Sequence, residues 1–319
     1  MSKYPWLVYV MLALATSSWG SAFIAGNYAT QDFSPITVAF FRFFFAAIIL
    51  LPLMWIREKD RPRPSGKDWL RFALLGLTGI ALYNICFFIA AREAPIVKSS
   101  LFIASNPVLI IVMSALFLKE KITRRNIIGL ALALSGAAVI ITEGNFMGVV
   151  RTGFEPIDFV LFIALICWAL YSVIGKVVLQ TFSSLVSTTY AVVFGTLMLM
   201  PFAVMDLTWE QVTSASALTW GSILHMSVIV SVVSFIMYYQ GIKMIGAGKA
   251  SIFINFMPLS AVILAIVLLG EPLLPIHILG AILVLTGVTV GTRAKKGRLG
   301  KLKSDKLNSG NSSVKEQTS

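Results

Sequence analysis

Long apolar runs make up most of this chain, and short polar or turn-rich segments separate one run from the next. A helix that crosses the hydrocarbon core of a bilayer needs about 20 consecutive apolar residues. The runs predict ten transmembrane helices, at residues 7–27, 36–56, 70–90, 96–118, 125–142, 157–178, 184–205, 218–240, 249–269 and 276–292. The pattern therefore predicts an all-α integral membrane protein without a sizeable domain outside the bilayer.

The composition excludes a water-soluble globule. Of the 319 residues, 57% are hydrophobic and 13% are charged, whereas soluble domains carry roughly 25% charged residues. The basic residues behind the net charge of +12 lie in the connections between the predicted spans and do not form one soluble face. We therefore expect no nucleic-acid partner. Cys86 and Cys167 lie in apolar runs without CxxC spacing, and predict neither a disulfide nor a metal site.

The basic residues are distributed unequally between the two sides of the predicted bundle. If the N-terminus is cytoplasmic, 22 of the 26 lysines and arginines fall in inside segments, and only Arg92, Lys98 and Arg151 fall in outside segments. The positive-inside rule then places both termini in the cytoplasm. Residues 294–319 are polar and partly basic, which predicts a disordered cytoplasmic tail that contacts membrane lipids through its basic part.

The two halves of the chain are similar in sequence. A shift of 149 residues places Trp19 on Trp168, and after two extra residues a shift of 151 places Pro107 on Pro258. The second register continues to the end of the last span without another gap, which makes chance a poor explanation.

This internal repeat determines the expected architecture. Residues 1–148 and residues 149–293 each contain five predicted spans. Because five is odd, the second copy must enter the bilayer upside down relative to the first. Inverted repeats are typical of secondary transporters, in which two similar bundles alternately expose a site at the midplane. Duplication for stability alone is the alternative.

Short segments at matching places in the two halves carry a family resemblance. In the first half they are Trp19-Gly20-Ser21, Arg42-Phe43 through Leu51-Pro52, Ala94 to Pro107, and Leu118-Lys119-Glu120 leading to Gly129. In the second half they are Gly248-Lys249-Ala250 to Pro258, Gly270-Glu271-Pro272, and Gly280 to Gly287. Over residues 7–292 the chain resembles the EamA-like branch of the drug/metabolite transporter (DMT) superfamily.

The resemblance implies a multi-pass carrier of the bacterial cytoplasmic membrane, with a central cavity lined by the first, third, fourth, sixth, eighth and ninth helices. Many members export amino acids or other metabolites, so a secondary exporter of a small organic metabolite is expected. Two alternatives stay open: an uptake or exchange permease of the same fold, and a non-transporting receptor or assembly protein. A homodimer is compatible with the sequence but not required by it.

Two prolines and their polar neighbours mark the expected midplane site. Pro107 and Pro258 fall near the middle of the fourth and ninth spans, and each removes a backbone hydrogen bond. We expect them to act as hinges beside Asn106 and Asn255, where a carrier would hold its ligand. A packing kink with locally bonded polar groups is the alternative.

Aromatic and amide side chains on the candidate lining helices predict the substrate site. Trp19 and Trp168 lie too deep for the interfacial belts where tryptophan is usual. Aromatic faces with polar tips suit a small organic molecule that has an apolar body. The predicted substrate-binding residues are Trp19, Asn84, Asn106, Trp168, Tyr171, Tyr239 and Asn255. For each of them, packing in the protein core is the alternative.

Arg42 is the one formal charge well inside a predicted run, and His225 is the one obvious proton carrier inside a predicted span. Arg42 would be costly if exposed to hydrocarbon, and we interpret it as a counter-charge for a substrate carboxylate or as a gate contact near the outer mouth. Snorkelling to the headgroups is the alternative. His225 is the candidate proton relay, with a hydrogen-bonded structural imidazole as the alternative. No aspartate or glutamate lies in a span interior, so the coupling ion is not predicted.

The remaining motifs are structural. Neither HExxH nor GxSxG occurs, and Lys243 and Ala250 break the pattern of a phosphate loop, so we expect no enzymatic activity, no cofactor and no metal. Glu120 and Glu271 precede the fifth and tenth spans and are interpreted as helix caps. Small faces that allow close helix contact, within the chain or with a second copy, are formed by Gly129, Gly136, Gly280, Gly287 and Gly291.

Overall fold

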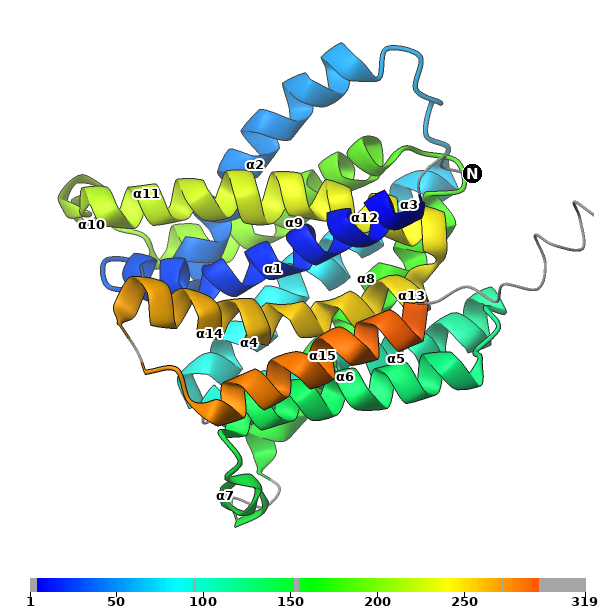
Figure 1. The fold of residues 1–319 in the computed structure, drawn as a ribbon. Helices are drawn as coiled ribbons and strands as arrows, with labels where there is room; N and C mark the ends of the chain where they lie inside the picture. Colours follow the sequence, from blue (N-terminus) through cyan, green and yellow to red (C-terminus); the bar gives the residue numbers. More distant parts are fainter. Residues whose placement is uncertain (1–4, 94–95, 152–154, 271, 293–319) are drawn as a thin grey trace, which may run out of the picture.

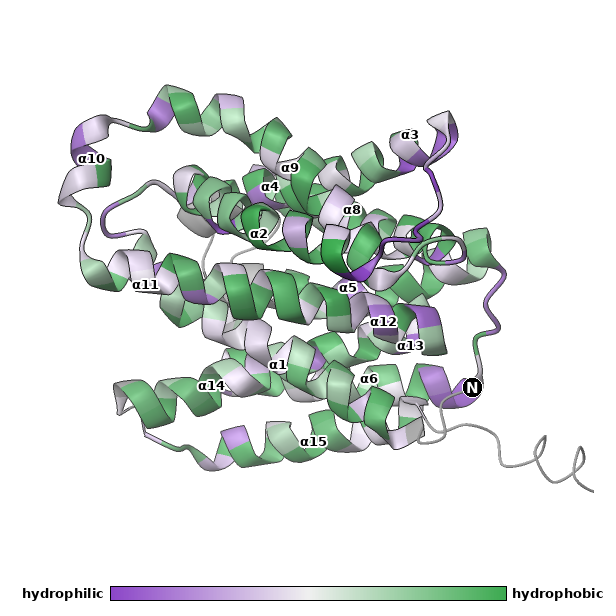
Figure 2. Cartoon of the chain, turned by 90° about the horizontal axis from the view of Figure 1, so that it is seen from above, coloured by the Kyte–Doolittle hydropathy of each residue, from purple (hydrophilic) through white to green (hydrophobic). Residues whose placement is uncertain are grey.

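The long helices of the protein lie side by side in one bundle (Figure 1). The computed structural model describes residues 5–93, 96–151, 155–270 and 272–292, and all regular elements in these ranges are helical. Within them, nine helices are long and apolar enough to cross a membrane, and Phe102–Leu118 is a shorter apolar helix. Hydrophobic residues cover these helices along their length (Figure 2). The chain is therefore a multi-pass helical membrane protein.

The helix bounds follow the predicted spans closely. The first half contains α1 (Pro5–Ala29), α2 (Pro35–Arg57), α3 (Gly66–Leu75), η1 (Gly76–Leu82), α4 (Tyr83–Glu93), α5 (Ile96–Leu118) and α6 (Arg124–Thr142). The short α7 (Phe146–Arg151) follows. The second half contains α8 (Pro156–Val178), α9 (Ser184–Asp206), α10 (Trp209–Ser214), α11 (Ala217–His225), η2 (Met226–Val233), α12 (Ser234–Ile245), α13 (Ala247–Ser251), η3 (Ile252–Asn255), α14 (Phe256–Leu269) and α15 (Pro275–Thr292). The predicted tail, residues 294–319, lies outside the described residues.

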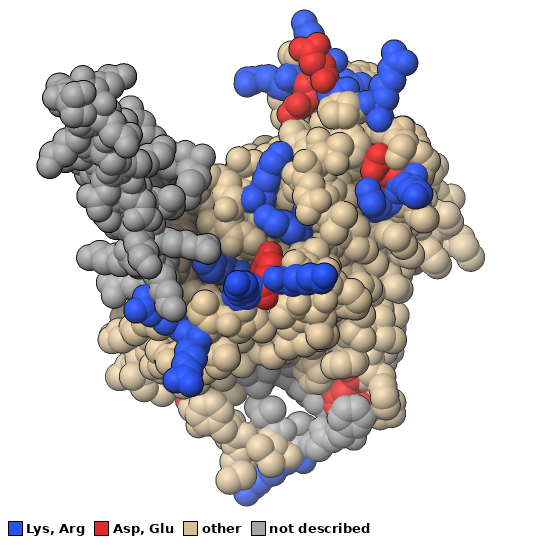
Figure 3. Space-filling view, turned by 90° about the vertical axis from the view of Figure 1, so that its right-hand side faces the viewer, with Lys and Arg blue, Asp and Glu red and all other residues tan. Residues whose placement is uncertain are grey.

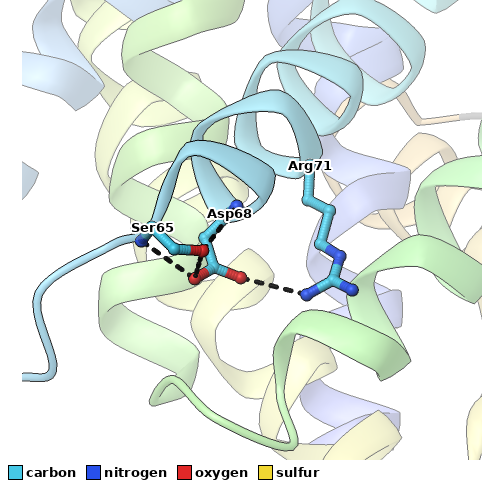
Figure 4. A network of polar contacts seen from close by, with 3 residues as sticks. All are labelled: Ser65, Asp68 and Arg71. Atoms are coloured by element: carbon cyan, nitrogen blue, oxygen red, sulfur yellow. Dashed lines mark hydrogen bonds and ion pairs between the residues drawn. The ribbon is translucent and has the colours of Figure 1, made fainter.

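Side-chain caps define where several helices begin. At the start of α3, the carboxylate of Asp68 accepts from the backbone N–H and the hydroxyl of Ser65, at 3.0 and 2.6 Å, and forms an ion pair with Arg71 at 3.0 Å (Figure 4). Because the first amides of a helix have no partner within the helix, such caps stabilise its first turn. The polar loop after α2 therefore ends at Ser65.

The cap of α6 differs from the sequence prediction. Thr123 and Asn126 form its capping box, whereas the Glu120 carboxylate accepts hydrogen bonds from Ala247 and Gly248 at the start of α13. The prediction that Glu120 caps the fifth span was therefore wrong, because Thr123 is closer to the helix start and satisfies the same amides. Glu271 lies outside the described residues.

Helix packing follows the same scheme in both halves. Helix α1 packs against α14 and against α11 and α12, and α8 packs against α5 and against α3 and α4. Helix α2 packs against α9, and α6 packs against α15. The glycines of α6 and α15 meet directly: a Cβ on Gly136 would lie 2.6 Å from the carbonyl oxygen of Gly280. The small faces predicted from the sequence therefore pack within the chain.

Three spans are interrupted by non-α segments. The π-helical segments η1 and η2 occur at equivalent positions of the repeat and interrupt the third and eighth spans. In the ninth span, the 3₁₀ segment η3 ends three residues before Pro258, as expected for a residue that disturbs its preceding turn. Helix α5, in contrast, runs through Pro107 without a change of helix type. The hinge role of both prolines stays a prediction.

Lysine and arginine side chains gather at one end of the bundle, where the N-terminus lies (Figures 1 and 3). The connections between α2 and α3 and between α5 and α6 carry basic residues there, including Lys59, Arg63, Lys121 and Arg124. We call this the basic end, and the end that contains the α1–α2 connection the opposite end.

Candidate functional site

A central cavity of about 480 Å³ lies between the two halves of the bundle. Its wall comes from the first, third, fourth, sixth, eighth and ninth spans, as the family resemblance implies, and also from α2. The lining residues are Trp19, Ala22, Phe23, Gly26, Asn27, Thr30, Pro35, Val38, Arg42, Phe43, Gly79, Tyr83, Asn84, Phe87, Ile103, Asn106, Trp168, Met226, Val230, Phe235, Ile254 and Met257. Pockets of about 300–1,000 Å³ are typical for small organic ligands.

The two predicted tryptophans meet at the cavity wall. The ring centroids of Trp19 and Trp168 are 5.4 Å apart with the planes at 87°, an edge-to-face geometry that aromatic quadrupoles favour. The indole N–H of Trp19 donates to the carbonyl oxygen of Val230 at 3.3 Å. Because Val230 belongs to η2, this bond connects the first span to the π-helical segment of the eighth.

Two predicted lining residues, Tyr171 and Tyr239, lie outside the cavity lining. Their rings stack with centroids 4.9 Å apart, and both side chains are fully buried. Farther along α8 and α12, the same helices carry Lys176 and Lys243 toward the basic end. The two tyrosine rings belong to a cluster of aromatic side chains in mutual contact. We call this cluster the aromatic plug and define it by Trp19, Trp168, Tyr171, Phe235, Tyr238 and Tyr239.

The three predicted asparagines lie in different surroundings. Asn84 lines the cavity and donates to the carbonyl oxygen of Ile80 at 2.6 Å. Asn106 also lines the cavity, and its Oδ1 is buried without a hydrogen-bond partner. Asn255 is fully buried just outside the lining, where it donates to Ile252 while its Oδ1 has no partner. Two of the three predicted asparagines thus belong to the cavity wall, where they are largely buried, and the third lies outside the lining.

Arg42 is a cavity residue that binds a hydroxyl group and packs on an aromatic ring. Its Nε donates to the hydroxyl of Ser231 at 2.8 Å, and its guanidinium carbon lies 4.8 Å from the centre of the Phe43 ring. Within the described ranges, no carboxylate forms an ion pair with Arg42. The side chain therefore lies in the cavity wall, and its role as a counter-charge or gate contact stays a prediction.

His225 lies away from the cavity lining. Its Nε2 is 2.8 Å from the hydroxyl oxygen of Ser21, and the residue is exposed on the bundle surface. Pro107 and Pro258 also lie outside the lining. Among the described residues, no group of three histidine, cysteine, aspartate or glutamate side chains could hold a metal ion.

Several lining residues, including Phe235 and Met257, were missed by the sequence analysis. In the register of the repeat, Phe235 is equivalent to Asn84 and Met257 to Asn106. The register that aligns the two halves would have found both, but helical periodicity alone could not, because an apolar residue in a membrane helix suits lipid, core and cavity equally.

A helical membrane protein with a cavity between two similar halves fits the class of transporters, and the sequence comparisons show that class directly. The chain belongs to the EamA-like transporter family, whose model matches residues 6–142 and again 156–292. A protein named uncharacterized transporter YyaM, from Bacillus subtilis, is 29% identical over 281 residues, with 88% of this chain and 92% of that protein covered.

Two further proteins are similar over most of their length. A probable terminal-alkyne amino-acid exporter of Streptantibioticus cattleyicolor is 26% identical, with 93% of this chain and 96% of that protein covered. A protein of known crystal structure superposes with a TM-score of 0.73 at 17% identity, with 89% of this chain and 97% of the other covered. At this level of identity, the similarity concerns the fold alone.

Proposed function

We propose that this protein is a secondary transporter that exports a small organic metabolite, an amino acid or a related compound, across the cytoplasmic membrane by alternating access. The observation that carries the proposal is the cavity between the halves, which is lined at equivalent positions of the repeat: Trp19 and Trp168, Gly79 and Val230, and Ile103 and Ile254. The amino-acid exporter among the similar proteins supports export as the direction.

The proposed architecture has ten spans in two inverted repeats, residues 1–148 and 149–293, with the tail and both termini in the cytoplasm. The matching contacts of α1 and α8 with the opposite halves support the repeat, and the basic end supports the orientation. In this reading, the cavity reaches the outer side through Asn27, Thr30 and Pro35, and the aromatic plug closes it toward the cytoplasm.

Flexible points are needed for the halves to rock around the cavity. The segments η1 and η2 both contribute to the cavity wall, and π-helical turns are often located at functional sites because their hydrogen bonds rearrange easily. We therefore place the bending of the third and eighth spans at η1 and η2, in addition to the predicted hinges at Pro107 and Pro258.

Reconstituted protein tests this function directly. Purified protein in liposomes is expected to move amino acids or related metabolites from a broad panel, and everted vesicles compared with right-side-out cells give the direction. Faster entry into right-side-out cells would indicate an uptake or exchange permease. Absence of flux for the whole panel, with and without a pH gradient, would indicate a receptor or assembly protein.

Compartment-sensitive reporters test the inverted repeat separately. A reporter fused after residue 148 is expected outside, and one fused after residue 319 is expected in the cytoplasm, because an odd number of spans lies between them. The same compartment for both fusions would contradict the inverted arrangement.

A further inference from the structure

The two halves contribute walls of different chemistry to the cavity. Hydrogen-bonding or charged side chains come from the first half alone: Asn27, Thr30, Arg42, Tyr83, Asn84 and Asn106. The second half contributes Trp168, Met226, Val230, Phe235, Ile254 and Met257, whose surfaces are apolar apart from one indole N–H. We call these the polar wall and the apolar wall.

The polar wall contains groups that still need partners. Arg42 uses Nε to bind Ser231, while its terminal nitrogens make no hydrogen bond to the described residues. A guanidinium presents its donors in a fork that matches a carboxylate. Asn106 is only 2% exposed, and its Oδ1 accepts no hydrogen bond from the part of the chain that the structure describes. Since unpaired buried polar groups are costly, an anion on the ligand would satisfy Arg42, and a donor on the ligand would satisfy Asn106 once its enclosed amide turns toward the cavity.

We propose that the substrate class is an organic carboxylate that has an N–H or O–H donor and an apolar body. Arg42 binds the carboxylate and Asn106 accepts the donor, while the body contacts the apolar wall around Trp168 and Phe235. The lining contains no aspartate or glutamate, so a ligand carrying only positive charge would face Arg42 without a counter-charge. This inference rests on the proposed function, because it names the substrate of the same cavity.

Thermal shifts of the detergent-purified full chain test the class with three matched probes. L-Phenylalanine has the carboxylate, the donor and the body; L-phenylalaninamide lacks the carboxylate, and L-alanine lacks the body. Because a ligand that binds the folded state raises its apparent stability, half-maximal shifts report the affinity. We expect phenylalanine to bind at least tenfold more tightly than either of the other two.

Variants of Arg42 test whether this residue causes the preference for a carboxylate. Arg42→Gln is expected to remove the preference for the acid over the amide, and Arg42→Lys to retain part of it. Arg71→Gln, which removes an arginine paired with Asp68 outside the cavity, is the control and leaves the preference unchanged. If Arg42→Gln does not fold, Ser231→Ala, which removes the partner of Nε, is expected to weaken binding of the acid more than binding of the amide.

Three outcomes would overturn this substrate class: equal affinity for acid and amide in the wild type, an unchanged preference in the folded Arg42 variant, or no shift with any of the three probes. The transporter proposal has its own measurement. A protein that moves cations or neutral compounds in liposomes would keep that proposal and lose this one.

A second, independent observation concerns the closed basic end. The Glu120 carboxylate, from the connection between α5 and α6, accepts from the backbone N–H of Ala247 at 3.1 Å and of Gly248 at 3.2 Å. It thus joins the first half of the chain to the junction of α12 and α13 in the second half. Nearby, Lys176 donates to the carbonyl oxygens of Ile242 and Lys243 at the end of α12.

The backbone at this junction is shaped around the carboxylate. Gly246 has a φ of 91°, which favours glycine, and a Cβ there would lie 2.6 Å from Oε1 of Glu120. On the other side, Lys119 has a φ of 54°, an uncommon value for a residue with a side chain. A side chain at position 246 would therefore disturb the contact, and the residue before Glu120 adopts a backbone conformation that is unfavourable for a lysine.

We infer that Glu120 is the latch of the cytoplasmic gate, bonded to α13 while that end is closed and released when it opens. This inference rests on alternating access as proposed above. Charge-assisted bonds to backbone N–H groups are stronger than neutral ones, so Glu120→Gln should shift the population toward the state open at the basic end. A residue that only maintained the fold would loosen both ends alike.

Cysteine labelling distinguishes these two roles. In a Cys86→Ala/Cys167→Ala background, Ser251→Cys reports on the basic end, since Ser251 is fully buried in α13, and Ala22→Cys reports on the cavity. With an impermeant maleimide, Glu120→Gln is expected to raise labelling of Ser251→Cys from the cytoplasmic side about tenfold, equivalent to about 1.4 kcal/mol. Labelling of Ala22→Cys from outside should not rise.

The controls separate the latch from a loss of charge or of fold. Glu58→Gln removes a carboxylate at the same end without touching α13, and we expect it to leave the labelling rates of both cysteine reporters unchanged. Glu120→Asp is expected to give a labelling rate of Ser251→Cys between those of the wild type and Glu120→Gln. An unchanged rate at Ser251→Cys, or a rise at both reporters, would overturn the latch. Flux by the wild type is measured independently. If the wild type transports while Glu120→Gln leaves the labelling rates unchanged, the latch is rejected and the transporter proposal is kept.

Discussion

Trp19 and Trp168 occupy equivalent positions in the two halves of the chain, and their rings meet edge to face with centroids 5.4 Å apart. The contact lies where the cavity ends and the aromatic plug begins, so the two residues belong to both. In the proposed alternating access, opening the cavity toward the basic end separates this pair.

We expect Trp19→Ala and Trp168→Ala each to reduce flux at least tenfold, because either change removes cavity wall and an aromatic contact worth about 0.5–1.5 kcal/mol beyond its buried area. Initial rates in liposomes measure the effect. Trp209→Ala in α10 is the matched control, since that side chain is 79% exposed. Flux near the wild-type value in both cavity variants would remove the pair from the transport path.

Asn255→Leu is expected to abolish flux while membrane expression stays near normal. The amide is fully buried and its Oδ1 has no partner, so an apolar residue of similar size replaces it without leaving a polar group unsatisfied. Expression and flux are compared with those of Asn145→Leu, near α7 on the surface. Normal flux in Asn255→Leu would exclude this amide from the substrate site.

His225→Gln is expected to weaken any dependence of flux on a proton gradient, because an imidazole can bind and release a proton and the amide of glutamine cannot. Since His225 lies outside the cavity lining, the rate without a gradient should fall less than in Trp19→Ala. The measurement is flux of the wild type and the variant with and without an imposed pH gradient. An unchanged dependence on the gradient in His225→Gln rules out His225 as the proton relay.

Gly136→Ala should destabilise the protein by about 1–3 kcal/mol, the usual cost of overpacking a close contact. A Cβ at this position would lie 2.6 Å from the carbonyl oxygen of Gly280 and 2.7 Å from the amide nitrogen of Val284. Thermal unfolding in detergent measures the loss. Gly221→Ala, where a Cβ meets nothing within 4 Å, is expected to have little effect, and equal Tm values for the two variants would contradict the α6–α15 packing.

Asp32 makes the stability of the opposite end depend on pH. Hydrogen bonds from the Thr219 hydroxyl at 2.6 Å and from the Ser216 amide at 2.8 Å lower the pKa of its carboxyl. A lowered pKa gives stability that is present above the unfolded-state value of about 3.9 and lost as the pH falls through the folded-state value. The Tm difference between wild type and Asp32→Asn should therefore shrink between about pH 6 and pH 3. Asp60→Asn, in the loop before α3, is the control, and a constant difference would contradict the role of Asp32.

The positions of the helices could be read from the sequence because the physics behind them is local. A bilayer requires apolar runs of a certain length, and the repeat is a comparison of the chain with itself. The glycine faces of α6 and α15 and the placement of Trp19 and Trp168 on candidate lining helices follow from such patterns.

Only the tertiary structure decided which buried side chains meet. Tyr171 and Trp168 are three residues apart on one helix, yet Trp168 lines the cavity and Tyr171 packs behind it on Tyr239. Glu120 precedes α6 but bonds to α13, more than a hundred residues later. In a membrane protein, lipid, protein core and cavity wall all accept the same residue types, so hydropathy separates none of them. The contacts across the two halves are what distinguish a lining residue from a packing residue.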